Sequence, residues 1–403
     1  MMTTTSSRDT SRQDSLLDLS SLMNLSILIY GQGQMIWEVT RNLTLIGVKS
    51  IIIIPPISPS PHQFNHHAFN TIQNLNPECK ITLYSQPLSL QDLTQNLIPQ
   101  HKLCILINIF NQKDITLINE ACRNHSPEPI GFLYGCNLGF YGNIFVDFGS
   151  QFIAKDPYKS QRTFPIMDLN LNTKEIEITT EDPSGLIRSG KSIKLKGTPF
   201  KIAKSALNRQ QNLTVITIEV PSDFAIDKKS CTSFELMVEP KMMKFESFKN
   251  SLSNFGLLQK GMMEGPQKLP SETLHHLFLA TLAFYEIFQR LPYPSDHPQF
   301  IALYQEVSFK NDLNKETLVH FLGNLSYEFP PIASLFGALL ANEALKISGT
   351  YIPLQQWLHF EEFSCAQNPK LHSLDPLHKI SQPFIPSNIF SNILTNNSLK
   401  NFK

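Results

Sequence analysis

The sequence lacks the patterns that indicate a metal site, a redox pair, a membrane span or a secretory signal. Its six cysteines form no C-x-x-C pair, so neither zinc binding nor redox chemistry is indicated. Their scattered positions favour reduced thiols in a cytoplasmic or nuclear protein. No hydrophobic run approaches the ~18–20 residues that cross a bilayer. The N-terminal residues are rich in Ser, Thr and Asp and lack the apolar segment of a signal peptide.

Charge is scarce and balanced. Only 17% of the residues are charged, and 34 Lys and Arg offset 34 Asp and Glu, which gives a formal net charge of zero. Without a basic field, the chain is not expected to bind nucleic acid, and without an apolar run no membrane contact is expected. The 403 residues suffice for two or three domains, and a 41% hydrophobic content can fill a sizeable core.

Strand-like and helix-like segments alternate in the first part of the chain. Ser26–Ile36 has the pattern of a strand, a glycine turn and the start of a helix. Val48–Ile54 and Leu103–Ile109 are apolar strands, and a helix is expected at 114–124. This alternation predicts an α/β fold with a Rossmann-like doubly wound sheet.

Two inserts interrupt this α/β pattern. Short alternating strands predict a β-rich insert at 163–240, and apolar residues at helical spacing predict a helical-bundle insert at 257–325. The remaining parts are a flexible N-terminus at 1–24, an α/β domain assembled from 25–160, 241–256 and 326–365, and a flexible tail at 366–403.

The candidate nucleotide site is the glycine turn that contains Gly31 and Gly33. In a dinucleotide-binding turn a third glycine lets the helix pack closely on the strand, but Ile36 stands at that position here. The acidic residue expected for the ribose after the second strand is replaced by Ile54-Pro55. Two interpretations remain, a vestigial turn that binds nothing and a residual ATP site.

No residue set predicts a catalytic group or a metal centre in this chain. Cys136 follows an apolar strand, and no Lys, Arg or His flanks it to lower the pKa of its thiol, so a buried structural cysteine is expected. His62, His66 and His67 lie near Pro59 and Pro61, where a solvated loop rather than a metal-binding helix is expected.

Several strings, taken in order, resemble the ubiquitin-activating enzymes. They are Asn137–Gly149, Phe245–Leu252, the closing helix Pro330–Lys346 and the run Ser348–Phe360. The resemblance covers roughly Leu25 to Phe363 and is to the N-terminal half of those enzymes, within the ThiF/MoeB-like family. It implies that the α/β domain is an inactive adenylation domain, that 163–240 is the first half of the cysteine domain, and that 257–325 is a four-helix bundle.

This resemblance implies a non-catalytic subunit of a ubiquitin-like-protein activating enzyme. Its partners would be a catalytic activating-enzyme subunit, in a heterodimer, and ubiquitin or a ubiquitin-like modifier. No cysteine matches the family's thioester cysteine, so adenylation and thioester transfer are expected on the partner, which would also hold ATP and Mg, and this chain alone would bind no cofactor. An alternative is a pseudoenzyme, an interaction protein of the same fold without activating activity. A stand-alone adenylating enzyme or nucleotide oxidoreductase is disfavoured by the interrupted glycine turn.

The resemblance also implies positions that act across a subunit interface. In the family an arginine from an N-terminal Arg-Gln reaches ATP in the partner domain, as an arginine finger does, and Arg12 matches it here. An arginine in a mobile tail is the alternative. Gly337, Ala338 and Ala341 form a smooth face on the closing helix, which would pack on the partner in the family's pseudo-dimer or on the chain's own sheet.

Overall fold

The computed structural model divides the chain into two compact units. One contains Ile153–Met242 with Gly349–Ile352, and the other contains Ser20–Phe152, Met243–Ser348 and the described residues from Pro353 on. The structure describes residues 17–56, 66–84, 88–157, 163–171, 175–182, 186–208, 212–221, 231–254, 258, 269–309, 313, 315–325 and 327–363. In these ranges no helix is long and apolar enough to cross a membrane, and no group of His, Cys, Asp and Glu is suited to hold a metal ion.

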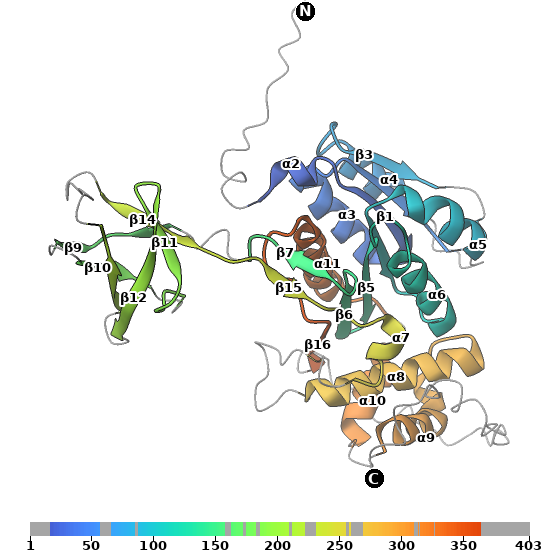
Figure 1. Cartoon of the computed structure of the whole chain (residues 1–403). Helices are drawn as coiled ribbons and strands as arrows, with labels where there is room; N and C mark the ends of the chain where they lie inside the picture. Colours follow the sequence, from blue (N-terminus) through green and yellow to red (C-terminus); the bar gives the residue numbers. More distant parts are fainter. Residues whose placement is uncertain are drawn as a thin grey trace, which may run out of the picture. The chain divides into compact units, whose positions relative to one another are not determined.

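A β-sheet flanked by helices forms the centre of the second unit (Figure 1). It has seven strands in the order β16-β6-β5-β4-β1-β2-β3. Five strands are parallel: β1 (Ser26–Gly31), β2 (Ser50–Ile54), β3 (Lys80–Leu83), β4 (Leu103–Ile107) and β5 (Gly131–Leu138). β6 (Tyr141–Asp147) pairs antiparallel with β5, and the edge strand β16 (Trp357–Glu361) pairs antiparallel with β6. β4 and β5 are buried along their whole length because the sheet is covered on both faces. The predicted Rossmann-like α/β fold is confirmed.

Helices cover both faces of this sheet. Those before the bundle are α2 (Leu19–Leu22), α3 (Gln34–Ile46), α4 (His66–Gln73), α5 (Leu90–Asp92), α6 (Gln112–Arg123) and α7 (Phe248–Ser251), with a π-helical turn at Leu93–Leu97 and a 3-10 turn at Ile98–Gln100. α4 begins at His66, where a loop was expected. His66 and His67 are therefore helical, while Pro59, Pro61 and His62 lie outside the described residues.

The bundle zone and the closing helix follow. They comprise α8 (Ser271–Phe288), a 3-10 turn at Pro294–Asp296, α9 (His297–Ser308), α10 (Lys315–Asn324), α11 (Pro330–Leu345) and a 3-10 turn at Lys346–Ser348. Every residue of α8 from Leu274 to Phe284 is buried, so this helix is a core element rather than an amphipathic surface helix. Its side chains share one large apolar cluster with β5, β6, α6 and Trp357.

The first unit contains the predicted β-rich insert, an antiparallel half-barrel. Its strands are β8 (Thr163–Pro165), β9 (Asp168–Leu171), β10 (Glu175–Glu181), β11 (Ser192–Leu195), β12 (Thr198–Asn208), β13 (Leu213–Glu219) and β14 (Ser233–Met237). Their order is β8-β14-β11-β12-β13-β10-β9. In β10, Ile176, Ile178 and Thr180 are buried and alternate with less buried residues, which gives the insert its own core. A two-stranded sheet pairs β7 (Phe152–Ala154) with β15 (Lys241–Met243).

Candidate functional site

The candidate site lies where β1 and β4 end side by side. In doubly wound sheets, ligands bind outside the carboxyl ends of the strands at the point where the strand order reverses. Here β1 ends at Gly31, and the following Gln32 N–H donates to the carbonyl of Ile107, the last residue of β4, over 3.2 Å. A Cβ at Gly31 would overlap that same carbonyl, so the close approach of the two strand ends accounts for this glycine.

A carboxylate of the chain itself occupies the glycine turn. Glu328, in the connection between α10 and α11, accepts through Oε2 from the backbone N–H of Gln34, the first residue of α3. Its Oε1 accepts from Asn108 Nδ2 over 2.5 Å. Gly33 has φ 97° and caps α3, and a Cβ there would overlap the Glu328 carboxylate. The carboxylate therefore lies where a nucleotide phosphate lies in a phosphate-binding turn.

The side chain of Asn108 makes hydrogen bonds to three parts of this site. Asn108 follows β4 in the left-handed region, with φ 53°, a conformation that Asn adopts more readily than most residues. Its Oδ1 accepts from the Asn137 N–H over 2.8 Å, and its Nδ2 also donates to the Gln32 carbonyl over 3.2 Å. The side chain thus joins the glycine turn, β5 and Glu328.

The segment that carries Glu328 is fixed to the end of the sheet. The N–H of Gly139 donates to the Tyr327 carbonyl over 2.7 Å, and Gly139 also forms a β-bridge with Glu328. The rings of Phe140 and Phe329 pack with their centroids 4.7 Å apart. Contacts on both sides of Glu328 therefore hold its carboxylate over the turn.

The residues at the turn do not fit a nucleotide. Ile36 is buried inside α3 and offers no phosphate contact, and Ile54 at the end of β2 is buried and followed by Pro55, so no carboxylate faces a ribose. The place of a phosphate is taken by the negative charge of Glu328. Sequence reasoning singled out Gly31 and Gly33 but missed Asn108 and Glu328, because nothing in the sequence places position 328 beside position 34.

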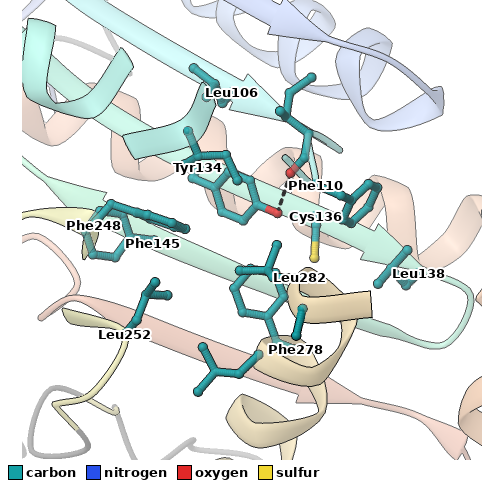
Figure 2. Close-up of a cluster of buried hydrophobic side chains, with 14 of the residues drawn as sticks. Leu106, Phe110, Tyr134, Cys136, Leu138, Phe145, Phe248, Leu252, Phe278 and Leu282 are labelled. Carbon is teal, nitrogen blue, oxygen red and sulfur yellow. Dashed lines mark hydrogen bonds between the residues drawn. The ribbon is translucent and has the colours of Figure 1, made fainter. Parts of the chain in front are cut away.

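Cys136 is a core residue. Figure 2 shows it among Tyr134, Leu138 and the α8 side chains Phe278 and Leu282, near the hydrogen bond from the Tyr134 hydroxyl to the Ile109 carbonyl. Burial raises the pKa of its thiol to about 12, so the thiolate that a thioester would require is not available near neutral pH. The other cysteines that the structure describes, Cys79, Cys104, Cys122 and Cys231, are also buried.

The residues predicted to contact a partner subunit, Gly337, Ala338, Ala341 and Arg12, differ in how buried they are or lie outside the described residues. Gly337 is buried, and a Cβ there would overlap the Cβ of Glu38 in α3, so this glycine serves close packing of α11 on α3. Ala341 is buried as well, whereas Ala338 is exposed. Arg12 lies outside the described residues. The interface role of these residues stays a prediction.

Two of the family-like segments, Asn137–Gly149 and Phe245–Leu252, are linked by Arg123, which binds Asp147 and Phe245. Asp147 Oδ1 accepts from Arg123 Nη1 over 2.6 Å and from the Gly149 N–H over 2.9 Å, while its Oδ2 accepts from Asn119 Nδ2 over 2.8 Å. Arg123 also donates to the carbonyl of Phe245, over 2.9 Å. Asp147 therefore joins β6 to α6 and, through Arg123, to the segment before α7, which is a structural role.

A second polar network, also missed from the sequence, crosses the core beside α8. Because the Leu252 carbonyl can only accept, neutral His275 donates to it through Nε2–H. His275 Nδ1 then accepts from the Nε2–H of His359, whose Nδ1 accepts from the Tyr141 hydroxyl, and all three bonds measure 2.9 Å. Asn143 Nδ2 donates to the Tyr141 hydroxyl oxygen over 2.9 Å. Every ring nitrogen has one partner when both imidazoles are neutral.

Comparison with known proteins finds relatives among the enzymes that activate ubiquitin and ubiquitin-like modifiers. No protein-family model matches the chain. It is 23% identical to ubiquitin-like modifier-activating enzyme 7 of Mus musculus over 412 aligned residues, covering 93% of this chain and 40% of that protein. It is 23% identical to ubiquitin-like modifier-activating enzyme 6 of Homo sapiens, covering 87% of this chain and 36% of that protein. For ubiquitin-activating enzyme E1 2 of Triticum aestivum the identity is 22%, covering 94% and 38%.

These matches span only about 35–40% of the length of the curated relatives, while they cover at least 84% of this chain. Similarity at this level, extended across both units, agrees with the α/β sheet, the half-barrel insert and the helices described above. Over most of its length the chain is homologous to the enzymes that activate ubiquitin and ubiquitin-like modifiers.

Proposed function

We propose that this chain is a non-catalytic subunit of a ubiquitin-like-protein activating enzyme. The observation that carries the proposal is the carboxylate of Glu328, which lies where a nucleotide phosphate would lie. In this chain, which is homologous to activating enzymes, the glycine turn is filled by the chain's own carboxylate. The chain would therefore contribute a structural scaffold, and a partner subunit would carry out the chemistry. The pKa of the buried Cys136 thiol is raised to about 12, which also supports placing the thioester chemistry on the partner subunit.

In this proposal, ATP and Mg are held by the catalytic partner subunit of a heterodimer. That partner adenylates the C-terminus of ubiquitin or a ubiquitin-like modifier and carries the thioester cysteine. The modifier contacts the α/β domain and the insert at 163–240, and Arg12 reaches the partner's ATP, where an arginine stabilises charge on the phosphates. We place this activity in the cytoplasm or nucleus, without nucleic-acid or membrane partners.

The proposal is tested by reconstitution. The tagged chain would be purified from its own cells, and the proteins that co-purify with it would be identified by mass spectrometry. The expected partner has an ATP-binding adenylation domain and a cysteine domain. The two proteins, made recombinantly, would then be assayed for ATP–pyrophosphate exchange and modifier thioester, separately and together.

Exchange and thioester formation should require both proteins, and an Arg12→Ala chain should assemble normally but slow exchange by ~10³-fold or more. Robust exchange by this chain alone would overturn the proposal. A chain that sediments as a lone monomer and leaves the activity of every candidate partner unchanged would instead be a pseudoenzyme of the same fold.

A further inference from the structure

We propose that Glu328 is a built-in anion that has replaced a phosphate at the N-terminus of α3, and that removing its side chain restores a phosphate-binding site. This inference goes beyond the proposed function, because it concerns the chain alone and holds whether or not a partner subunit exists.

The first step of the argument is that α3 needs an anion from elsewhere. Its capping residue is Gly33, which has no side chain, and its first turn contains no acidic residue. The backbone N–H groups at a helix start are unpaired and carry partial positive charge, so a negative group there is stabilising. Glu328, 294 positions away in sequence, supplies that charge to the Gln34 N–H.

The second step is that the carboxylate is held as a ligand is held, by donors from separate elements. Oε2 accepts from the glycine turn after β1, and Oε1 accepts from Asn108 after β4 over 2.5 Å. Asn108 is itself oriented by the Asn137 N–H, which donates to its Oδ1. This donor set lies at the reversal of strand order, where nucleotides bind in doubly wound sheets.

The third step is that phosphate and Glu328 exclude each other. The absence of a Cβ at Gly33 leaves room for one anionic group, and the Glu328 carboxylate fills that room. A second anion would meet both overlap and like-charge repulsion. Truncation to alanine leaves the Gln34 and Asn108 donors aimed at an open space, which a phosphate can enter because Glu328 is only partly buried.

The experiment measures the thermal midpoint of the full chain in sodium chloride and in inorganic phosphate at matched ionic strength. Glu328→Ala should melt below the wild type in chloride and should gain roughly 2–4 °C more from phosphate than the wild type does. Glu120→Ala, which removes an exposed glutamate from α6, is the matched control and should gain no more than the wild type. This comparison separates site binding from the general stabilisation that phosphate gives.

Glu328→Gln distinguishes a lost ligand from a lost contact. This variant keeps the side-chain volume, removes the charge and points an amide donor at Gln34 or Asn108. Its thermal midpoint in chloride should therefore lie below that of the wild type, and phosphate should not restore it. Equal rescue of both Glu328 variants, or rescue of Glu328→Ala no larger than that of the wild type, would overturn the inference. If Glu328→Ala does not fold in chloride, recovery of folded protein in phosphate supports the inference and failure to recover it refutes it.

Discussion

Acidification should destabilise the protein through the two buried imidazoles beside α8. His275 and His359 are almost fully buried and hydrogen-bonded in one direction, from Asn143 through Tyr141 to the Leu252 carbonyl. Burial lowers the pKa of His275 from 6.5 to about 4, and burial holds the pKa of His359 well below its usual value. A proton on either ring would place a charge in the core and would turn its accepting Nδ1 into a donor that faces another donor.

The sign and size of the effect follow from linkage. Because the folded-state pKa is the lower one, the unfolded chain binds more protons, so stability is fully present above pH ~6.5 and falls as the pH drops toward about 4. Between pH 7.5 and pH 5, His275 alone should cost about 2 kcal/mol of unfolding free energy, since the slope approaches ~1.4 kcal/mol per pH unit. His359 adds a loss of the same sign.

Urea titrations at pH 7.5 and pH 5 would measure this difference. His275→Gln should be less stable at pH 7.5 but should lose about 2 kcal/mol less on acidification than the wild type. Leu282→Ala, a neighbour on α8, is the control, because it destabilises through a cavity without removing a titrating group and should keep the wild-type pH dependence. A His275→Gln variant with the full wild-type loss would refute the reasoning.

Three further predictions concern single positions. Cys136, whose pKa burial raises to about 12, should resist iodoacetamide in the native protein and react in urea, and rapid native labelling seen by peptide mass spectrometry would contradict this. Asp147→Ala should cost about 3–5 kcal/mol in urea titrations because it leaves Arg123 without its carboxylate, and a cost below ~1 kcal/mol would be inconsistent with a buried pair. Gly337→Leu should lower the melting temperature because its side chain would overlap α3, whereas Ala338→Leu, at an exposed position, should leave it unchanged and weaken binding of a catalytic partner. Equal melting temperatures for the two variants would count against the packing argument.

The fold could be predicted because its signals are local. The apolar run Leu103–Ile107 is a strand buried on both faces, and the alternation of Ile176 and Ile178 marks a strand of the half-barrel. The helix at His66–Gln73 was missed because nearby prolines were taken as evidence against it, although a proline restricts its own φ and clashes with the residues before it rather than those after it. The assignment of Cys136 to the core was also accessible, since a missing cationic neighbour is visible in the sequence.

The polar interactions could not be predicted because they join residues that are far apart in the chain. Glu328 meets Gln34 across 294 positions, and Tyr141 meets His359 across 218. Neither pair has a spacing that a helix or strand would bring together, so only the folded sheet places them side by side. Burial makes the Tyr141–His359 pairing strongly specified, because an unpartnered polar atom at such a position costs about 1–3 kcal/mol.

Gly31 and Gly33 show why an interrupted glycine turn is a weak guide to nucleotide binding. The protein's own packing requires each glycine without any nucleotide. Gly31 leaves space for the Ile107 carbonyl, and Gly33 leaves space for the Glu328 carboxylate. Both would therefore persist in a chain that binds no nucleotide, since any side chain would collide with the protein itself. The informative residue is the one that fills the space the glycines leave. If that residue is an acid, as here, the turn has an anion of its own, and the sequence feature that suggests ATP binding becomes an argument against it.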